Sequence, residues 1–593
     1  MRKRIFGFSV ILLFMMVRLG AQPMAAAGAD VQPLSGILTA RGKLIVDGNE
    51  RSVILRGMGL GGWMLQESYM FRLSGLGPQF RIRQKIADLV GEQQAARFYD
   101  GWLKNHTTKA DIDSLAAWGF NSIRLPMHYR LYTLSVDEEP VAGKNTWLQK
   151  GFELTDSLLA WCRADHLYLI LDLHAAPGGQ GNDLNISDRD PDKPSLWQSS
   201  ACREKTVALW RKLAQRYAGD PAIGGYDILN EPNWGFEDPK DIRGTRETGN
   251  QPLRQLMMEI SAAIREVDPA HLIIIEGNGF GNNYNGIFPL WDSNMVVSFH
   301  KYGNFNTAAS IRKYLDLQDK YQMPLWLGES GENSNTWFTE AIGLVESYNI
   351  GWCWWQQKKM GINNPLEIRA SPSYQMLLDY WLKNGRKPGA EEARVALKEW
   401  LENIRIGRNV YHKDVTDAMF RQVGSVSTLP FVPHRIGNGA SIKAVDYDLG
   451  RCGYAYQDND TARYQYASPP QPSAGNRGWM YRNDGVDIAA GDAGDYYVFD
   501  TEDGEWLQYT VDVVEPGVYT LVFTMATGSD SSRFTVMCDG RPLAAPVAVG
   551  NTGGPASWRN FEIKNIRLRK GECRLRVVVE KGGFNFSRME FRR

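Results

Sequence analysis

The sequence predicts a (β/α)8 barrel followed by a C-terminal β-sandwich. Short apolar runs alternate with helical stretches over roughly 370 residues, which is typical of a parallel barrel. Beyond about residue 424 the helical periodicity fades, and short strands separated by turns dominate. A doubly wound sheet is the alternative for the first part, but that fold does not need eight strand–helix units.

The N-terminus has the pattern of a secretory signal peptide. Basic residues at 2–4 precede an apolar run over 5–17 and then a small-residue stretch. We expect cleavage between Ala21 and Ala27, so 1–27 is the predicted signal peptide. The run is too short for a confident membrane span, no later segment is apolar enough for one, and no cysteine is placed for a lipid anchor. We therefore expect a secreted or periplasmic protein, a monomer without membrane attachment.

Composition excludes several other classes. The 593 residues carry 67 basic and 67 acidic side chains, so no charge excess favours nucleic acid or an acidic partner. The six cysteines are scattered and lack the C-x-x-C spacing of a metal cluster. Their disulfide pairing cannot be deduced from the sequence. We expect no metal, nucleotide or redox cofactor for catalysis.

The predicted barrel domain spans 28–423. Residues 37–57 alternate as in a hairpin that closes the bottom of the barrel and then runs into the first strand. The next strands are expected at 121–126, 167–174, 225–231, 271–277, 295–302, 324–329 and 351–355. Helical stretches lie between them, among others at 111–119, 203–217 and 253–267.

Two glutamates follow apolar runs of this set. Glu231 lies in GGYDILNEPN (224–233), and Glu329 lies in MPLWLGESGE (323–332). Since the carboxyl ends of all barrel strands meet at one face, the two carboxyl groups can face each other across a pocket. Such a pair can cleave a glycosidic bond, one member as acid and the other as nucleophile or base. The alternative at each position is an ion-paired loop residue.

Further side chains at strand ends belong to the same face. They are Arg124, His174, Asn230, His300, Tyr302 and Trp355. Each has a structural alternative: an ion-pair partner for Arg124, a hydrogen-bonded core residue for His174, and a loop cap for His300 and Tyr302. Chance rarely places such residues at six strand ends on one face.

This constellation resembles glycoside hydrolase family 5 over about 37–400. The matching motifs are SIRLP, DLHAAPG, LNEP, SFHKY, LGES and GWCWW. The resemblance implies Glu231 as acid/base and Glu329 as nucleophile of a retaining mechanism with a covalent intermediate. Tyr302 or Arg124 near Glu329 would keep that carboxylate ionised, whereas a less compensated Glu231 can hold a proton. Asn230 is expected to hydrogen-bond a sugar 2-hydroxyl.

The segments 61–71 (GGWMLQESYMF) and 89–126 resemble the exo-β-1,3-glucanase branch of that family. The resemblance implies that Glu67 helps form a blind pocket for a terminal glucose, with Trp355 offering its ring face to a sugar. The alternative for Glu67 is a surface loop residue. We expect a secreted retaining hydrolase of β-glucan, as an exo-β-1,3-glucosidase or an endo-β-glucanase. The same machinery acting on β-mannan or xyloglucan, and a non-catalytic carbohydrate-binding protein, are the alternatives.

A Pro- and Gly-rich linker is expected at 424–439, followed by the sandwich at 440–593. Its predicted strands include 505–513, 517–526, 533–540 and 572–580. This part resembles carbohydrate-binding module family 6, which implies Tyr481 and Asn585 as glycan contacts.

Three other positions of the module differ from that family. Pro555 replaces an expected aromatic residue, and Trp558 is either a binding platform or a core residue. Lys443 and Val445 stand where the family has the acidic pair of a structural calcium site. A module that only packs on the barrel is the alternative to one that binds glycan.

Overall fold

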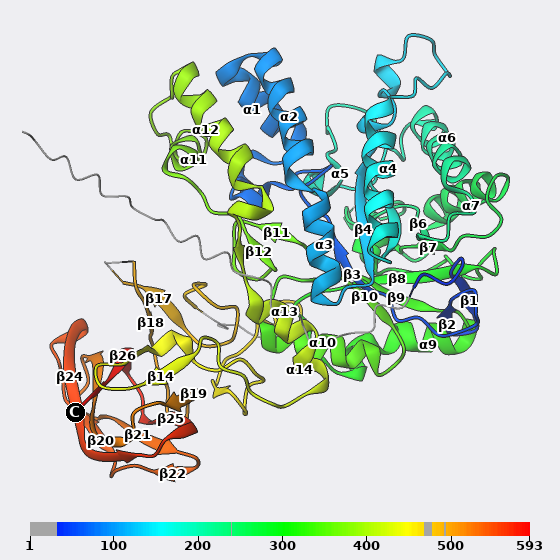
Figure 1. Cartoon of the computed structure of the whole chain (residues 1–593). Coiled ribbons are helices and arrows are strands. Elements are labelled where there is room, and N and C mark those ends of the chain that lie inside the picture. The colour runs from blue at the N-terminus through cyan, green and yellow to red at the C-terminus, as the bar shows by residue number, and fades with distance from the viewer. Residues whose placement is uncertain (1–32, 239, 468–476, 492–493) are drawn as a thin grey trace, which may run out of the picture.

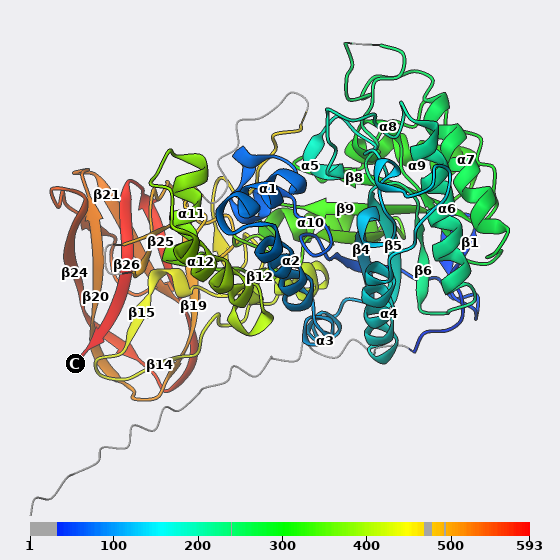
Figure 2. The ribbon, with the colours of Figure 1, turned by 90° about the horizontal axis from the view of Figure 1, so that it is seen from above.

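The structure is a computed structural model that describes residues 33–238, 240–467, 477–491 and 494–593. The predicted signal peptide (1–27) lies outside the described residues. The chain forms a barrel-containing part and an all-β part that lies beside it in both ribbon views (Figures 1 and 2). Within the described ranges, no helix combines the length and the apolarity needed to cross a membrane.

Eight parallel strands close into a barrel in the order β10-β3-β4-β5-β6-β7-β8-β9. The strands are β3 (Arg56–Gly59), β4 (Ser122–His128), β5 (Tyr168–Ala175), β6 (Ile223–Asp227), β7 (Ile273–Ile275), β8 (Met295–Lys301), β9 (Leu325–Gly331) and β10 (Gly351–Trp355). The predicted barrel is therefore confirmed. Because β6 ends at Asp227, Glu231 lies in the loop that follows it.

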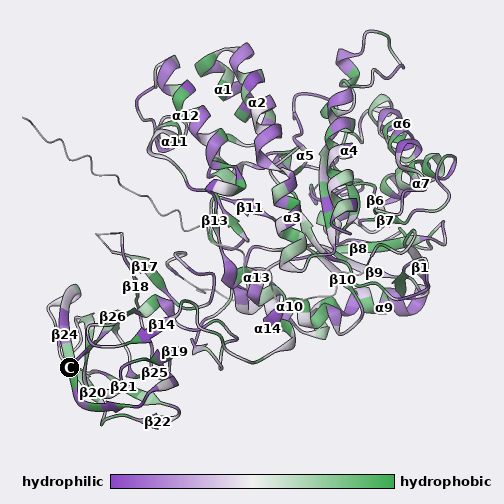
Figure 3. Ribbon diagram, in the orientation of Figure 1, coloured by the Kyte–Doolittle hydropathy of each residue, from purple (hydrophilic) through white to green (hydrophobic). Residues whose placement is uncertain are grey.

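Amphipathic helices cover the outside of this barrel. They include α3 (Lys109–Trp118), α4 (Gln149–Ala164), α6 (Ser200–Tyr217), α7 (Gln251–Arg265), α9 (Arg312–Tyr321) and α10 (Asn335–Glu346). Both α6 and α7 contain hydrophobic as well as hydrophilic residues (Figure 3), as expected for helices with one face packed on a core. The predicted helices at 111–119, 203–217 and 253–267 correspond to α3, α6 and α7.

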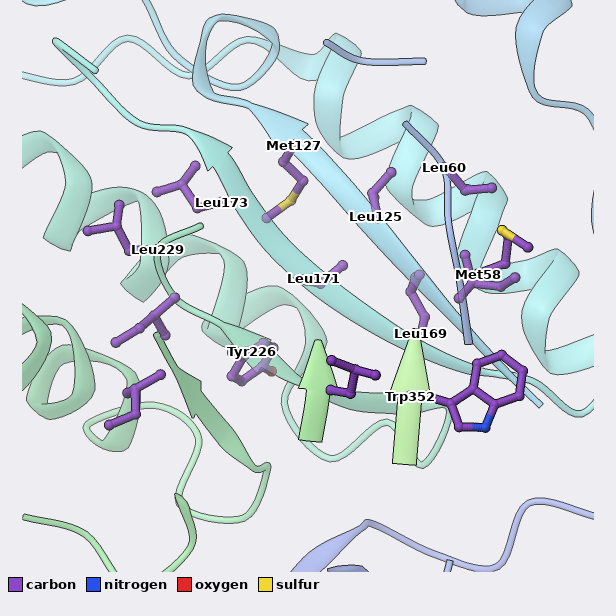
Figure 4. Packing of buried hydrophobic residues seen from close by; sticks show 14 of the residues in the cluster. Met58, Leu60, Leu125, Met127, Leu169, Leu171, Leu173, Tyr226, Leu229 and Trp352 are labelled. Carbon is purple, nitrogen blue, oxygen red and sulfur yellow. The ribbon is translucent and has the colours of Figure 1, made fainter. Parts of the chain in front are cut away.

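Successive side chains of a barrel strand point alternately outward and inward, which separates apolar from polar residues. Leu125 on β4 and Leu171 on β5 point outward and pack in the layer between strands and helices (Figure 4). The intervening Arg124, Asp172 and His174 point to the barrel interior, where they contact one another or other strand-end residues. The same strands therefore contribute apolar side chains to the core and polar side chains to the site.

The N-terminal hairpin closes the bottom of the barrel, as the sequence predicted. Strands β1 (Thr39–Arg41) and β2 (Leu44–Val46) pair antiparallel. Leu38 and Ile45 pack in one cluster with the interior residues Ile170 and Trp326. This apolar plug leaves the opposite, carboxyl end of the barrel as the open face.

A helical layer flanks that open face. It contains α1 (Gln79–Val90), α2 (Glu92–His106), α11 (Pro372–Leu382) and α12 (Ala390–Asn403). Trp102 and Trp400 lie in its core, which also includes Trp355 of β10. The ring of Trp355 is thereby buttressed from outside the barrel. The remaining short elements of this part are α5 (Leu184–Ser187), α8 (Asn278–Gly281), β11 (Lys358–Lys359), β12 (Leu366–Glu367), β13 (Val410–Tyr411), α13 (Lys413–Met419) and α14 (Arg421–Gly424).

Two antiparallel sheets form the C-terminal sandwich. One contains β14 (His434–Ile436), β16 (Tyr456–Gln457), β19 (Trp506–Val513), β21 (Ser532–Cys538), β22 (Arg541–Pro542), β23 (Val547–Val549) and β25 (Gly571–Lys581). The other contains β15 (Ser441–Lys443), β17 (Ile488–Ala490), β18 (Tyr496–Val498), β20 (Gly517–Thr527), β24 (Gly554–Leu568) and β26 (Phe584–Arg592). One pairing, β14 with β19, is parallel. Since β14 lies within the predicted linker 424–439, the first strand of the sandwich starts inside that linker.

Candidate active site

Arg124 on β4 is the centre of a buried polar cluster at the open end of the barrel. Its guanidinium donates to Glu329 Oε2 at 2.8 Å and to Asp227 Oδ2 at 2.8 and 3.0 Å. It also donates to Asn230 Oδ1 at 2.7 Å and to Glu276 Oε1 at 3.0 Å. A side chain with 0% exposure can keep its charge only with such partners. Arg124 thus fixes the positions of four strand-end groups.

Glu329 on β9 receives two hydrogen bonds. Arg124 Nη1 donates to Oε2 at 2.8 Å, and the Tyr302 hydroxyl donates to Oε1 at 2.7 Å. Burial and the Glu329 charge raise the pKa of Tyr302 well above its ordinary value, so the phenol keeps its proton and can only donate here. Two donors aimed at a carboxylate stabilise its ionised form.

Glu231 sits in a different environment from Glu329. Its backbone has a φ of 43°, in the left-handed region that non-glycine residues seldom occupy. Its amide donates to Glu276 Oε2 at 2.7 Å, and Oε1 of Glu231 lies 2.6 Å from His300 Nδ1. Burial raises the pKa of Glu231, and the neighbouring Glu329 and Glu276 charges add to this effect, while His300 opposes it. This strained residue is held by contacts on both its backbone and its side chain.

Glu276 directly follows β7 and contacts Arg124, His300 and the Glu231 amide. Oε1 accepts from Arg124 and lies 3.1 Å from His300 Nε2, and Oε2 accepts from the Glu231 amide. Burial by itself would raise its pKa, but the charges of His300 and Arg124 lower the pKa of Glu276 to about 2. Glu276 is therefore a fixed anion with every oxygen in use, which suits a positioning role.

The remaining predicted barrel residues form a second group beside this cluster. His174 Nδ1 lies 2.8 Å from Asp172 Oδ2, and its Nε2 lies 3.7 Å from Glu67 Oε1. The rings of His174 and Trp355 stack with centroids 5.1 Å apart and an interplanar angle of 7°. Trp355 Nε1 donates to the Tyr69 hydroxyl at 2.9 Å. Glu67 is thus buried beside the site and is not a surface loop residue.

The site contains more acidic side chains than basic ones. Six carboxyl groups (Glu67, Asp172, Asp227, Glu231, Glu276 and Glu329) face three groups that can be cationic (Arg124, His174 and His300). Burial raises the pKa values of Asp227 and Glu231, and burial raises the pKa of Glu67 to about 7. Three carboxyl groups with raised pKa values balance an excess of three negative charges.

All nine predicted barrel residues except Arg124 and Asn230 line a cavity of about 910 Å³ at this open end. Arg124 and Asn230 lie beneath it, bonded to each other and to its floor. The structure thus brings the whole predicted set into one place. The cavity is large enough for a small ligand with several polar groups.

One metal-binding possibility falls in this cavity. Single ligand atoms of Glu231, His300 and Glu329 lie within 4.8 Å of one another, which is the one such group found among the described residues. His300, however, has a carboxylate oxygen on each ring nitrogen. Although burial lowers it, the charges of Glu276 and Glu329 raise the pKa of His300 well above its ordinary value. A doubly protonated ring offers no lone pair, so this group does not fit a metal ion.

Tyr481 and Asn585, the predicted glycan contacts of the module, hydrogen-bond to different residues of the described chain. The Tyr481 hydroxyl donates to Asp446 Oδ1 at 2.5 Å. Asn585 donates to the Pro555 carbonyl at 2.8 Å. Trp558 is 38% exposed on β24, with its ring 5.1 Å from that of Tyr497, so it is a surface residue and not a core residue.

The two positions that stand in place of a calcium-binding pair are explained by packing. Val445 lies in the core of the sandwich. Lys443 Nζ lies 3.2 Å from Asp495 Oδ1. A buried aliphatic side chain and a paired ammonium are not calcium ligands.

Some residues of the site were missed from the sequence. Glu276 follows the apolar run III of HLIIIEG, the same signal that identified Glu231 and Glu329, and was overlooked. Asp172 and Asp227 also carried the signal of a polar residue inside a buried strand. The cavity wall further includes Arg463 and Trp479 from the chain beyond the predicted linker, for which no local pattern exists.

Comparison with known families identifies both parts of the chain. Residues 85–361 match the family described as cellulase (glycosyl hydrolase family 5). Residues 479–593 match the family described as carbohydrate binding module (family 6). The substrate of such a pair of domains is a carbohydrate.

Curated relatives carry several glycosidase names. A beta-xylosidase of Phanerodontia chrysosporium is 29% identical over 411 residues, covering 63% of this chain and 80% of that protein. Endoglucanase C of Acetivibrio thermocellus is 24% identical over 332 residues, covering 46% of this chain and 89% of that protein. A probable glucan 1,3-beta-glucosidase A of Emericella nidulans is 30% identical over 271 residues, covering 44% and 61%. The chain thus carries a domain that matches glycosyl hydrolase family 5 and a C-terminal domain that matches carbohydrate-binding module family 6, and it is a glycoside hydrolase.

Proposed function

We propose that the protein is a secreted retaining β-glycosidase that removes terminal glucose from a β-1,3-glucan. The observation that carries the mechanism is the spacing of two carboxyl groups. One oxygen of Glu231 and one of Glu329 lie within 4.8 Å of each other. Retaining glycosidases hold the two groups about 5–5.5 Å apart, whereas inverting ones leave about 6.5–9.5 Å for a water molecule.

Glu329 is the proposed nucleophile. Arg124 and Tyr302 each donate a hydrogen bond to one of its oxygens, and such donors favour the ionised form that a nucleophile needs. Its free electron pair attacks the anomeric carbon of the sugar, and the bond from that carbon to the leaving oxygen breaks. The product of this step is a glycosyl ester of Glu329.

Glu231 is the proposed acid and then base. Its raised pKa lets it hold a proton, which it donates to the leaving oxygen as the bond breaks. In the second step the ionised Glu231 takes a proton from water, and that water attacks the anomeric carbon. The ester bond to Glu329 breaks, so the carboxylate is regenerated and the configuration is retained.

Three side chains are proposed to hold the terminal sugar. Arg124 can only donate, so the Asn230 atom that faces it is Oδ1. The amide nitrogen of Asn230 lies 3.3 Å from His174 Nε2, and its second hydrogen can be donated to the sugar 2-hydroxyl. Trp355 offers a ring, and its orientation is fixed by stacking with His174. Glu67, buried beside His174, lines the cavity and is available to accept hydrogen bonds from sugar hydroxyls.

The exo assignment is supported by Glu67 and by one group of relatives. Glu67 is a buried carboxyl group in the cavity lining, where it can hydrogen-bond the hydroxyls at the end of a glycan chain. The relative from Emericella nidulans is named as a probable glucan 1,3-beta-glucosidase. The name beta-xylosidase of another relative makes a terminal xylose the second candidate, since xylose lacks only the hydroxymethyl group of glucose.

Secretion is part of the proposal and is supported by the N-terminal pattern of residues 1–27. A polysaccharide substrate is too large to enter a cell, so a hydrolase of this kind acts outside the cytoplasm.

Product analysis on soluble β-1,3-glucan tests the proposal. Glucose should be the main early product, and an aryl β-glucoside should be turned over faster than the matching β-xyloside. An early ladder of oligosaccharides would show an endo-acting enzyme. Turnover of the xyloside alone would replace glucose by xylose, and activity only on β-mannan or xyloglucan would replace the glucan.

A further inference from the structure

The cavity around the catalytic glutamates is completed by the C-terminal part of the chain. Arg463, Gln465, Tyr466 and Trp479 line it together with Glu231 and Glu329. All four lie beyond the predicted linker, between β16 and β17 of the sandwich. Ala462 of this segment is 2% exposed and belongs to the core cluster of the barrel. The segment is therefore packed on the barrel and is not a free tether.

Backbone hydrogen bonds fix this segment to the loops that follow the site strands. Asn333, four residues after Glu329, donates from Nδ2 to the Arg463 carbonyl at 2.7 Å and accepts from the Arg463 amide at 3.0 Å. The Tyr466 amide donates to the carbonyl of Gly303, next to Tyr302, at 3.0 Å. A Cβ at Gly303 would lie 2.6 Å from the Gln465 side chain, so the two segments are in close contact.

Arg463, Gln465, Tyr466 and Trp479 are called the wall below. A second set of buried hydrogen bonds holds the side of the wall near Trp479. Asn483 donates to the Asn333 carbonyl at 2.9 Å and to Asn335 Oδ1 at 3.0 Å. The Asn335 amide donates back to the Asn483 carbonyl at 2.8 Å. The side chains of these three asparagines are almost fully buried. Buried polar groups that are mutually satisfied define one geometry, so the position of the wall is specified.

The wall lies across the barrel mouth from the proposed terminal sugar. Its contacts are with the loops after β8 and β9. Glu67 lies against His174 of β5. In the closed strand order, β9 is four strands from β5 in either direction, which is the opposite side of an eight-stranded barrel. The wall thus packs on the loop after the strand that faces β5 across the barrel, and β5 carries the His174 that contacts Glu67.

The chemistry of the wall fits a neutral sugar. The Arg463 guanidinium lies 4.1 Å from the centre of the Trp479 ring, and Trp479 is partly exposed to the cavity. An indole ring binds the apolar C–H face of a pyranose, and a guanidinium donates to hydroxyl oxygens. We infer that Arg463 and Trp479 bind the leaving-group unit of the glycan, so the C-terminal part of the chain contributes to substrate specificity. This inference rests on the proposed function of the same cavity.

The test uses the full-length chain and two substrates. Trp479→Ala should raise KM for a β-1,3-linked glucose trisaccharide about tenfold, because one aromatic–sugar contact is lost. Arg463→Ala should raise it less, since its backbone bonds to Asn333 remain. Both variants should keep wild-type kcat/KM on β-glucosyl fluoride, whose leaving group is too small to reach the wall.

The matched control is Trp506→Ala. Trp506 also pairs with an arginine, Arg576 at 3.6 Å, but it lies outside the residues that line this cavity. It should leave both substrates unaffected. An unchanged trisaccharide KM in Trp479→Ala, or an equal loss on the fluoride, would overturn the inference.

Failure of the proposed function gives a different result. A wild-type protein that cleaves neither substrate contradicts the proposed function. Calorimetric titration of the trisaccharide then still decides the inference: weaker binding by Trp479→Ala than by wild type supports it, and equal or absent binding in both overturns it.

Discussion

Glu231 and Glu329 are identical side chains that lie among different neighbours. Glu329 faces two donors, Arg124 and Tyr302, while Glu231 is buried beside other carboxyl groups. Only His300 offsets that burial for Glu231. The division of roles between acid and nucleophile is therefore decided by which donors each carboxyl group meets.

Removing the proposed acid should slow the reaction without abolishing binding. We expect Glu231→Gln to lower kcat by roughly 10²–10⁴-fold on a substrate with a poor leaving group. The loss should be much smaller on a dinitrophenyl glycoside, whose leaving oxygen needs no proton. Steady-state kinetics on both substrates measure this difference. Glu204→Gln on the exposed side of α6 is the control, and an equal loss on both substrates would contradict the acid role.

The pH dependence follows from the same residue. Since Glu231 must be protonated in the first step, kcat/KM should fall as pH rises through its raised pKa. In Glu231→Gln this alkaline fall should disappear from the residual activity on a dinitrophenyl glycoside. The pKa of Glu67 is also raised by burial, to about 7, so Glu67→Gln must be profiled in parallel. Loss of the alkaline fall in Glu67→Gln alone would assign it to Glu67.

Most of these residues could be predicted from the sequence because the local signal is strong. A polar residue directly after an apolar run lies at the open face of a barrel, which identified Glu231, His300 and Glu329. Glu276 carried the same signal. What the sequence does not contain is the partner of each group, because Arg124 and Glu276 are 152 positions apart and meet only after the barrel closes.

At the scale of elements, the alternation along each strand couples stability to the site. On β5, Leu171 packs outward against helices (Figure 4). Its neighbour Asp172 lies 3.3 Å from the Arg124 guanidinium. The strand positions its catalytic face only if its apolar face stays packed.

Truncating this outward layer should therefore destabilise the barrel. We expect Leu171→Ala, at a site with 0% exposure, to lower the free energy of unfolding by about 2–5 kcal/mol. The barrel transition in a thermal unfolding scan should move to lower temperature. Val395→Ala on α12, where the side chain is 46% exposed, should leave it unchanged. An unshifted transition in Leu171→Ala would contradict the packing account.

Element types were predictable from periodicity, and their ends were less so. The strand predicted at 225–231 ends at Asp227. The strand predicted at 271–277 is reduced to Ile273–Ile275. In both cases polar side chains after the apolar core of the run bond to residues of the site: Asn230 Oδ1 accepts from Arg124, and Glu276 Oε2 accepts from the Glu231 amide. Function thus overrides the strand pattern at these ends.

At the scale of the whole molecule, the sandwich and the barrel share a buried polar interface. Asn333, Asn335 and Asn483 form its centre and lie within a few residues of the cavity wall. No sequence pattern indicates this docking, because it joins residues 148–150 positions apart without any periodic signal. The expectation of a separate module on a linker was the natural one from composition alone.

Breaking that interface should destabilise the chain and impair both soluble and insoluble substrates. Asn483→Ala leaves the buried Asn333 carbonyl without this donor, at a cost of about 1–3 kcal/mol. We expect a lower midpoint of thermal unfolding and lower kcat/KM on a soluble trisaccharide. Asn459→Ala, at an exposed position of the same module, is the control. Activity lost on insoluble glucan alone would instead favour simple tethering.

The central claim is that Glu329 forms a covalent bond to the sugar. Incubation with an activated 2-deoxy-2-fluoro-β-glucoside, followed by mass spectrometry of the digested protein, measures this directly. The account predicts the mass of one fluoroglucosyl residue on the peptide that contains Glu329, and no such label in Glu329→Ala. A label on another residue, or hydrolysis with inverted configuration and no label, would contradict it.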